Sequence, residues 1–511
     1  MGMRVLAALK CAYRNYGSSK TPAAPPRKPA PGKEPREAGS KKDRPKGARA
    51  ARTSTRTRHL QWTEEQTRII SAVSGGQSVF VTGSAGTGKT ALLKHIIKLL
   101  KDSLGRSRVF VTASTGVAAC ALRGQTLHSF AGIRNPSHRA SALDIYMDKK
   151  ACKRWKKVRA LFIDEISMVD GELFDDLECI AREVRESGET WGGIQLIVTG
   201  DFLQLPPIPR NGNCMSRKQF AFEADCWQSS FDLQIELTKV FRQSDERLVK
   251  VLQGIRKGQI SPDDWEFLEE SCASDEPDPS VVQLYPRNED VNEVNNSRIE
   301  ELAAEGYFFT AADSGSDPWK RQVQRGMAPD EIFLCKGARV MLIKNKNTSR
   351  GLVNGAVGTV VEFVKPQDRD VSELCSEGVL PVVKFDSGRT VVIELETWYV
   401  VDGDSVVAQR KQIPLILAWA LSIHKCQGMS LDSLHTDLTR SFGYGMVYVA
   451  LSRVRSLSGL HLSGFDPTII KAHPKALEFY ERLAHQHNKR SEDDGSSEEE
   501  HGCSDLVDHS S

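Results

Sequence analysis

The 511-residue sequence contains no run of 18 or more apolar residues, so we expect no membrane-spanning helix. Its eleven cysteines include no Cys-x-x-Cys pair and no Cys/His cluster with zinc spacing. This argues against both a disulfide framework and a structural zinc ion. A reducing interior compartment is the simplest interpretation. With 40% hydrophobic and 26% charged residues, the chain has the composition of a globular protein with several domains.

Charge is distributed unevenly along the chain. Residues 1–58 carry 16 Lys and Arg against 3 Asp and Glu, whereas residues 489–511 carry 2 against 8. The central 430 residues therefore have a net charge of −4. Any binding of nucleic acid by this central part must rely on a local surface rather than on overall charge.

The first 33 residues contain no acidic residue. Arg4, Lys10 and Arg14 alternate with apolar residues and predict a short basic amphipathic helix, which is typical of a mitochondrial transit peptide. Residues 21–58 are rich in Pro, Ala, Lys and Arg, and we expect them to be disordered. We predict a mitochondrial location; a nuclear address such as KKDRPKGARAAR is the alternative.

Between the charged ends, apolar strand-like segments alternate with helical ones. SVFVTG, RVFVTAS, ALFIDEI and IQLIVTG indicate a parallel, doubly wound α/β sheet, with ligands at the carboxyl ends of its strands. SVVQLYPR, ARVMLIKN, PLILAWALSI and GLHLSGF predict a second such half. Short strands separated by Gly, Pro and Asp turns at about 355–411 predict a small antiparallel barrel inserted into it.

One eight-residue segment matches the phosphate-binding loop pattern G-x-x-x-x-G-K-[ST], with a strand before it and a helix after it. Its glycines allow successive backbone N–H groups to surround phosphates at a helix N-terminus. We expect Lys89 to reach the β- and γ-phosphates and Thr90 to bind Mg²⁺. The ATP-binding residues are thus Gly83, Ser84, Ala85, Gly86, Thr87, Gly88, Lys89 and Thr90.

Three further side chains are candidates for the chemistry of hydrolysis. Asp164 and Glu165 end the apolar strand ALFI; we expect the first to hold Mg²⁺ and the second to orient or deprotonate the attacking water. Gln204, in GDFLQLPPI, is a candidate sensor of the γ-phosphate. The alternative for this segment on its own is a proline-rich turn.

Two distant arginines complete the catalytic set. Arg242 lies in LTKVFRQSD and Arg453 in VYVALSRVRS. An arginine that reaches the γ-phosphate from another domain stabilises transition-state charge and makes hydrolysis depend on closure of a cleft. Either arginine alone would more often be a surface residue.

In order, GSAGTGKT, TASTGVAA, GQTLHSFAG, IDEISM, GDFLQLPP, VFRQSD, AWALSIHKCQGMSLD and YVALSRV resemble the motifs of superfamily 1 DNA helicases. They are most similar to those of Pif-type (petite integration frequency) 5′→3′ helicases, which are related to RecD-like enzymes. The resemblance spans about residues 60–483. It implies two RecA-like domains, at 59–235 and 236–483. Composition predicts a basic segment at 1–58 before them and an acidic disordered tail at 484–511 after them. It also implies a wedge near 132–150 and an SH3-like insertion on the expected barrel at about 355–411.

The resemblance also implies roles for individual residues. Gln66 stands where the family reads adenine. The residues implied to contact a DNA strand are Thr115, His128, Ser129, Phe130, His424, Lys425, Gln427, Tyr448 and Ser452. Such a mixture supplies phosphate donors and stacking faces without a strong net charge.

The chain departs from the family pattern at Ser422, Cys426 and Met446, where Thr, Ser and a nearby Gln are common. Met446 puts one coupling contact in doubt, but no catalytic candidate is changed. We therefore predict an ATP- and Mg²⁺-dependent, monomeric 5′→3′ helicase acting on single-stranded, duplex or forked DNA, with no membrane partner. The alternatives are a related RecD- or relaxase-type helicase, a translocase that displaces proteins without unwinding, and a nucleotide-gated DNA-binding scaffold.

Overall fold

The computed structural model describes residues 61–133, 145, 148–207, 217–273, 281–317, 319–324, 328–346, 352, 354–366, 375–402, 405–441, 443–464 and 466–499. The chain divides into two compact units, Met1–Gln61 and Trp62–Ser511. The expected targeting segment lies outside the described residues, as does most of the expected wedge.

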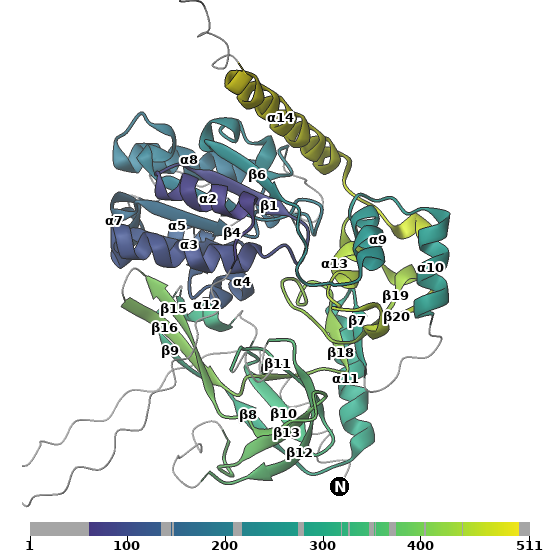
Figure 1. Cartoon of the computed structure of the whole chain (residues 1–511). Helices are drawn as coiled ribbons and strands as arrows, with labels where there is room; N and C mark the ends of the chain where they lie inside the picture. Colours follow the sequence, from purple (N-terminus) through teal and green to yellow (C-terminus); the bar gives the residue numbers. More distant parts are fainter. Residues whose placement is uncertain are drawn as a thin grey trace, which may run out of the picture. The chain divides into compact units, whose positions relative to one another are not determined.

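The second unit begins with a six-stranded parallel sheet of order β3-β2-β4-β5-β1-β6 (Figure 1). Its strands are β1 (Val79–Gly83), β2 (Val109–Ala113), β3 (Gln125–Thr126), β4 (Ala160–Asp164), β5 (Gln195–Thr199) and β6 (Leu233–Leu237). The associated helices are α2 (Glu64–Ser74), α3 (Lys89–Leu104), α4 (Gly116–Ala121), α5 (Leu127–Ala131), α7 (Lys149–Lys157) and α8 (Gly171–Arg185). The parallel α/β fold expected for the first half is confirmed.

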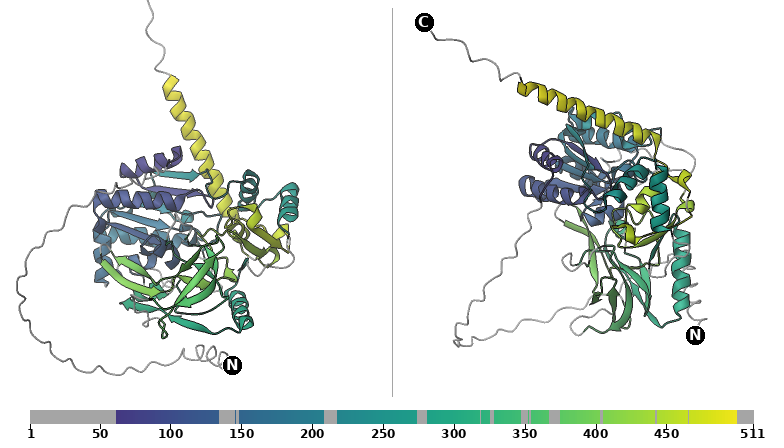
Figure 2. Two further views of the ribbon diagram at one scale, coloured as in Figure 1. Left: turned by 60° about the horizontal axis from the view of Figure 1, so that its bottom comes forward. Right: turned by 45° about the vertical axis from the view of Figure 1, so that its right-hand side comes forward.

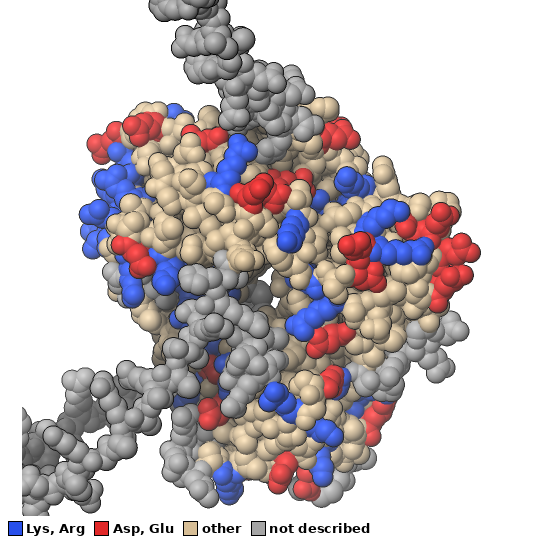
Figure 3. Space-filling model, in the orientation of Figure 1, with Lys and Arg blue, Asp and Glu red and all other residues tan. Residues whose placement is uncertain are grey.

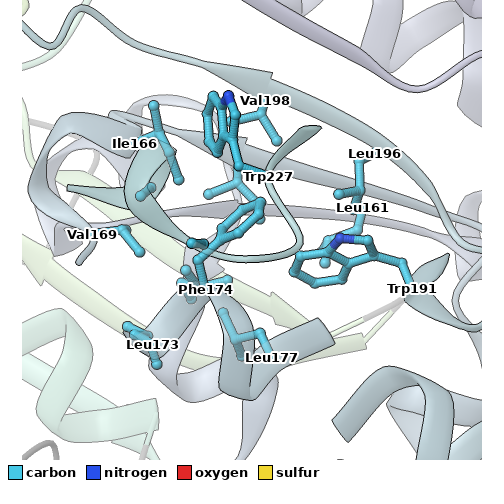
Figure 4. Packing of buried hydrophobic residues seen from close by; sticks show 14 of the residues in the cluster. Leu161, Ile166, Val169, Leu173, Phe174, Leu177, Trp191, Leu196, Val198 and Trp227 are labelled. Carbon is cyan, nitrogen blue, oxygen red and sulfur yellow. The ribbon is translucent and has the colours of Figure 1, made fainter. Parts of the chain in front are cut away.

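The two faces of this sheet are covered by different helices, because successive side chains of a strand point to opposite faces. Val79 and Val81 of β1 pack in one cluster with the apolar side chains of α2 and α3. Phe80 faces the other way, into a cluster with α5, α7 and α8. Figure 4 shows Phe174 and Leu177 of α8 packed near Trp191 and Trp227 in this second cluster.

A second, four-stranded parallel sheet has the order β18-β7-β19-β20. It consists of β7 (Val282–Tyr285), β18 (Ala420–Ser422), β19 (Leu434–Asp437) and β20 (Leu460–Ser463). Its core cluster includes side chains of α9 (Glu246–Arg256), α10 (Pro262–Cys272) and α13 (Met446–Leu451), and Asn295 of α11 (Asn288–Leu302) hydrogen-bonds the backbone of Ala420. The two parallel sheets agree with the expected pair of RecA-like folds.

The strands between β7 and β18 form antiparallel sheets, and here the expectation was wrong for ARVMLIKN and for the first part of PLILAWALSI, Leu415–Leu417. The second part of PLILAWALSI forms the parallel strand β18 as expected. ARVMLIKN, assigned above to the second parallel half, contains β11 (Arg339–Leu342), which pairs antiparallel with β12 (Val357–Val364) and β17 (Leu415–Leu417). All four β11 residues are buried, so its continuous apolar run looks like that of a parallel strand. The same sheet continues through β13 (Leu380–Phe385) and β14 (Thr390–Val392).

The segment expected as one barrel contributes to two sheets. β12, β13 and β14 belong to the five-stranded sheet. β15 (Glu396–Asp402) and β16 (Ser405–Gln412) pair with each other, and β16 also pairs with β9 (Ala312–Gly315) in a three-stranded sheet. β8 (Gly306–Thr310) and β10 (Glu331–Cys335) form a further pair, and the short helix α12 (Trp319–Gln324) contributes Trp319 and Val323 to a small cluster with β15 and β16.

The long helix α14 (Pro474–Glu499) packs on the first sheet although it follows the second in sequence. Its Ala476, Phe479, Tyr480 and Leu483 belong to the core cluster that contains Phe80. Figures 1 and 2 show the helix extending from the second half past the first. The helix continues through Glu499, so the expectation of disorder from residue 484 was wrong. Residues 484–490 continue directly from the packed turns and include Ala, Gln, Lys and Arg, through which a helix extends at little cost. The following residues, SEDDGSSEE, include Ser, Asp and Gly, so helix propensity does not explain why the helix continues through them.

Candidate active site

The phosphate-binding loop lies between β1 and α3. Gly86 and Gly88 have φ angles of 88° and 87°, in the region that favours glycine, which allows the tight loop to lead into the helix N-terminus. Nζ of Lys89 donates to the carbonyl oxygens of Gly83 and Ser84, at 2.6 and 3.0 Å. Burial lowers the pKa of Lys89, while the carboxylates of Asp201 and Glu165 raise it in part. A loop of backbone N–H groups with one lysine is suited to bind polyphosphate.

Asp164 ends β4 beside this loop. Its Oδ1 accepts hydrogen bonds from Oγ1 of Thr199, at 2.6 Å, and from the backbone N–H of Glu165, at 2.9 Å. Burial raises its pKa despite these two bonds. The hydroxyl of Thr199, at the end of the neighbouring strand β5, therefore fixes the orientation of the carboxylate.

Glu165 adopts a left-handed backbone conformation, with φ of 55°, which is uncommon for a residue with a side chain. The hydroxyl of Ser114 holds this conformation by donating to the carbonyl oxygen of Glu165, at 2.8 Å. Nε2 of Gln427 donates to the carboxylate, at 3.0 Å. Burial and the negative charge of Asp164 raise the pKa of Glu165 to about 7, a value suited to proton transfer near neutral pH.

Gln204 lies in a buried hydrogen-bond network centred on Asp201. Its Nε2 donates to Oδ2 of Asp201, at 3.2 Å, and Asp201 also forms an ion pair of 2.9 Å with Arg256 of α9. The charge of Asp201 raises the pKa of Lys89, which shows that the network is electrostatically coupled to the phosphate-binding loop. The predicted role of Gln204 as a γ-phosphate sensor stays a prediction.

Arg242 packs directly against the phosphate-binding loop. A methyl group added at Gly86 would lie 2.7 Å from Cβ of Arg242, and the adjacent Phe241 N–H donates to the carbonyl oxygen of Gly86, at 2.8 Å. Nη1 of Arg242 donates to the carbonyl oxygen of Ser452, at 2.7 Å. Burial and the charge of Arg453 lower the pKa of Arg242 to about 9.

Arg453 is fully buried next to α13. Its guanidinium donates to the carbonyl oxygen of Val449, at 2.7 Å, and to Oγ of Ser452, also at 2.7 Å. Burial lowers its pKa, and its positive charge offsets part of the rise in the pKa of Glu165. Arg453 therefore lies close enough to interact electrostatically with both Arg242 and Glu165. This connects the two candidate arginine fingers to the catalytic carboxylate through Arg453.

Three residues expected to bind DNA lie on the nucleotide side of the molecule. The hydroxyl of Tyr448 accepts a hydrogen bond of 2.7 Å from the backbone N–H of Ala85 in the phosphate-binding loop. Ser452 contacts both arginines, and Gln427 contacts Glu165. The structure thus gives these three side chains contacts with the ATP site instead of an open surface.

The other expected DNA contacts differ in accessibility. The ring of Phe130 is 0% exposed and packs on Phe110 and Trp155, so it offers no face to a base; its strand-binding role is not supported. Thr115 and Ser129 are partly exposed, and each accepts a local backbone or side-chain hydrogen bond. His128 is partly exposed, whereas His424 and Lys425 are exposed after β18.

Gln66, which the family resemblance assigns to adenine, lies beside the phosphate-binding loop. It forms a capping box with Thr63 at the start of α2, and its Nε2 donates to the carbonyl oxygen of Thr87, at 3.4 Å. The ring of Phe241, 51% exposed, lies 3.7 Å from the Cβ position of Gly88. The sequence analysis did not select Phe241, although it stands in the quoted segment LTKVFRQSD.

Sequence reasoning also missed Asp201, Arg256 and Tyr480. Asp201 was in a quoted motif, but nothing in the sequence singles out Arg256 or Tyr480, because their importance depends on contacts between distant segments. Met446, the departure from the family pattern, is buried at the start of α13 and packs in the core of the second half. No group of three or more His, Cys, Asp or Glu suited to a metal occurs among the described residues.

Comparison with family models gives two matches. Residues 61–263 match a model described as PIF1-like helicase, and residues 323–363 match a model of the 2B domain of the DNA helicase Pif1. The second match overlaps the antiparallel strands β10, β11 and β12.

Individual proteins and structures give the same result. A Xenopus laevis protein named ATP-dependent DNA helicase PIF1 is 41% identical over 438 residues, covering 84% of this chain and 66% of that protein. The crystal structure of Pif1 helicase from Candida albicans matches with 37% identity and a TM-score of 0.66, over 83% of this chain and 100% of that one. The structure of Bacteroides sp Pif1 in complex with ADP-AlF4 matches with 29% identity and a TM-score of 0.69, over 83% and 98%. The chain spans just under two thirds of the length of the Xenopus relative.

Proposed function

Because the chain belongs to the Pif1 family of helicases, we propose that it is an ATP-dependent DNA helicase that translocates 5′→3′ on single-stranded DNA and unwinds duplex or forked DNA. The observation that carries the proposal is the contact between the two halves at the nucleotide site. Gln427, Tyr448 and Arg242 each hydrogen-bond or pack there across more than 150 residues of sequence. The direction of movement rests on the resemblance of the ordered motifs.

The residues present fit a bound Mg²⁺–ATP. Mg²⁺ keeps several waters and binds one or two carboxylates plus substrate phosphates. The carboxylate of Asp164 at the end of β4 and the hydroxyl of Thr90 in the first turn of α3 would hold it. The ion would neutralise charge on the β- and γ-phosphates. Lys89 binds the same phosphates, Glu165 accepts the proton of the attacking water, and Arg242 and Arg453 stabilise transition-state charge.

Hydrolysis then drives movement because the site is shared. ATP favours closure of the two halves, because its phosphates attract the guanidinium groups of Arg242 and Arg453. Release of the γ-phosphate removes this attraction, so the closed arrangement is no longer favoured. Alternating grip on the DNA backbone by the two halves converts this cycle into translocation. His128 and Ser129 on the first half and His424 and Lys425 on the second are the side chains that we assign to the strand.

The test uses forks with a single 5′ tail or a single 3′ tail of equal length. The purified protein should hydrolyse ATP when single-stranded DNA is added and should separate only the 5′-tailed fork. Equal unwinding of the 3′-tailed fork would overturn the polarity. Strong DNA-stimulated hydrolysis without strand separation would instead identify a translocase, and binding without hydrolysis would identify a scaffold.

We further propose a mitochondrial location for the protein and a monomeric state in solution. The location rests on the basic, acid-free composition of residues 1–33. A fluorescent fusion with and without residues 1–58 tests it: loss of mitochondrial signal on deletion is expected, and a nuclear signal from the full chain would contradict it. Sedimentation equilibrium measures the oligomeric state. Among the described residues, no helix has the length and apolarity needed to cross a bilayer.

A further inference from the structure

Helix α7 has a face made almost entirely of lysine. Its sequence, KKACKRWKK, contains no acidic residue, and all five lysines are exposed. Three exposed arginines lie nearby in the fold, at the starts of β2 and β4. We call these eight side chains the α7 basic face: Lys149, Lys150, Lys153, Lys156, Lys157, Arg106, Arg108 and Arg159. Figure 3 shows blue side chains gathered at the left edge, where Figure 1 labels α7.

The opposite face of α7 is fixed to helix α5. The buried Arg154 donates from Nε to the carbonyl oxygen of Phe130 and from Nη2 to that of Ser129, both at 2.8 Å. Nε1 of Trp155 donates to the carbonyl oxygen of Ala131, at 3.2 Å. The lysines are therefore presented by a rigid helix that is attached to the segment expected to hold a DNA strand.

Arg108 and Arg159 continue the basic face onto the sheet. The backbone N–H of Arg159 donates to the carbonyl oxygen of Arg108, at 2.8 Å, directly before the paired strands β2 and β4. Both arginines thus lie at the amino-terminal edge of the sheet, whereas Asp164 lies at the carboxyl end of β4. Five residue steps along β4 lead from Arg159 to Asp164, so at about 3.3 Å per residue the Cα atoms of these two residues lie about 16 Å apart.

A shallow hollow adjoins the face at Lys156, Arg159 and Arg185. The guanidinium of Arg185 donates to the carbonyl oxygens of Gly192, Trp155 and Val158, which fixes its position. Burial and the neighbouring charge of Arg159 lower its pKa. Two acids, Glu186 and Glu189, also line the hollow, so the lysines of α7 form the more uniformly basic part of the surface.

The eight cations form no ion pair with an acid in the part of the chain that the structure describes. Eight cations this close together repel one another. Such a cluster is unusual in a central region whose net charge is −4. Lys149, Lys153 and Lys157 follow one another at intervals of four residues, about one helical turn, so a regularly spaced polyanion can contact several of them at once. No exposed aromatic side chain interrupts the face, which favours contact with a backbone over stacking with bases.

We propose that the α7 basic face binds the phosphate backbone of DNA, as a second DNA-binding surface outside the expected strand path between the two halves. The proposal rests on the proposed helicase function. Lysines and arginines on a rigid helix contact phosphates without reading sequence. The surface would hold the DNA that enters or leaves the first half next to α5.

The test compares two variants of the full chain with equal net charge. The first is K153Q/K156Q/K157Q/R159Q, in which glutamine keeps helix propensity similar to that of lysine. The matched control is K250Q/K257Q/K336Q/R389Q, which also removes four exposed cations. Lys250 lies on α9 and Lys257 directly follows this helix, whereas Lys336 lies between β10 and β11 and Arg389 between β13 and β14. Fluorescence anisotropy measures the Kd for a blunt duplex, a fork and a single strand over a range of NaCl concentrations.

Removal of four phosphate contacts should reduce the slope of log K against log[NaCl] by about 3–4 for duplex DNA, or by about 2–3 for single strands. We expect affinity to fall at least tenfold in the α7 variant and less than threefold in the control. The type of DNA whose slope changes identifies which part of the fork the face holds. Hydrolysis stimulated by a saturating short single strand should stay unchanged, because the ATP site is distant.

Unchanged slopes in both variants, or equal changes in both, would overturn the proposal. The proposal would also be overturned if the α7 variant bound DNA normally but no longer bound an acidic peptide, such as one with the sequence of residues 491–500. Failure of the unaltered chain to bind any DNA would instead refute the proposed helicase function. Circular dichroism spectra that match the unaltered chain ensure that a loss of affinity reflects the surface and not unfolding.

Discussion

Nε2 of Gln427 donates a hydrogen bond of 3.0 Å to Oε2 of Glu165, although the two residues lie 262 positions apart in the sequence. Glu165 follows a strand of the first sheet, and Gln427 follows a strand of the second. The carboxylate assigned to accept the proton of the attacking water is therefore oriented by the other half of the molecule. Any rearrangement of the halves that separates these atoms changes the environment of the catalytic carboxylate.

Replacement of Gln427 by alanine should slow DNA-stimulated ATP hydrolysis by about 10–100-fold. The reason is that a hydrogen bond to a charged group contributes about 1.5–3 kcal/mol, and here it positions the reacting group. Single-turnover phosphate release measures the rate. Binding of a fluorescent ATP analogue should stay within about twofold of the unaltered protein, and a loss of affinity equal to the loss of rate would contradict a positioning role.

Replacement of Lys89 by alanine should abolish both hydrolysis and unwinding. Its ammonium group is held by the carbonyl oxygens of Gly83 and Ser84 at the start of the loop, where phosphates are expected. Loss of one preorganised electrostatic group costs about 10²–10³ in rate. Phosphate release and strand displacement are measured in parallel with Lys98→Ala, an exposed position about two and a half turns further along α3. Retention of more than a tenth of either activity in Lys89→Ala would refute the assignment.

The ion pair between Asp201 and Arg256 predicts a pH dependence of stability. Burial alone would raise the pKa of Asp201, but the charge and hydrogen bonds of Arg256, the charge of Lys89 and the hydrogen bond from Gln204 together outweigh it, and the pKa is lowered. A carboxyl group with a lowered folded pKa stabilises the fold above the ordinary value, near 4, and loses this contribution as the pH falls through the lowered value.

Arg256→Met should therefore lower the free energy of unfolding by about 3–5 kcal/mol at pH 7, because it leaves a buried carboxylate without its partner. In the variant, burial raises the pKa of Asp201, so protonation relieves the penalty as the pH falls from 7 toward 4. The difference between the two proteins, measured by urea denaturation across this range, should narrow. A difference that stays constant with pH would contradict the electrostatic explanation.

The sequence predicted the parts of the fold and site that depend on local pattern. The Gly-rich loop, the acids after β4 and the apolar strands of the first sheet were all identified because neighbouring residues carry the signal. The error over β11 has a physical cause, since a strand buried on both faces looks the same in parallel and antiparallel sheets. Phe130 shows the corresponding limit for sites, because its motif position suggested exposure but its ring completes a core.

Contacts between distant segments were beyond prediction from sequence pattern, and Tyr480 is the clearest example. Its hydroxyl lies within hydrogen-bond distance of Thr82, donates to Asp201 at 3.0 Å and accepts from the backbone N–H of Phe202 at 3.2 Å. Its ring lies 4.8 Å from the guanidinium of Arg256. Helix α14 thus inserts one side chain into the network that surrounds Gln204.

Tyr480→Phe should lower the free energy of unfolding by about 1–3 kcal/mol, because it leaves the buried backbone N–H of Phe202 without its partner and removes one hydrogen bond to Asp201. Tyr480→Ala should lower the free energy of unfolding by about 3–5 kcal/mol in total, since it also removes the buried ring. Thermal or urea denaturation of the full chain measures both, with Tyr444→Phe, an exposed tyrosine, as the control. If the network positions Gln204, Tyr480→Phe should also slow hydrolysis at temperatures where the variant is fully folded. Equal stability of the Phe variant and the unaltered chain would show that these hydrogen bonds make no net contribution.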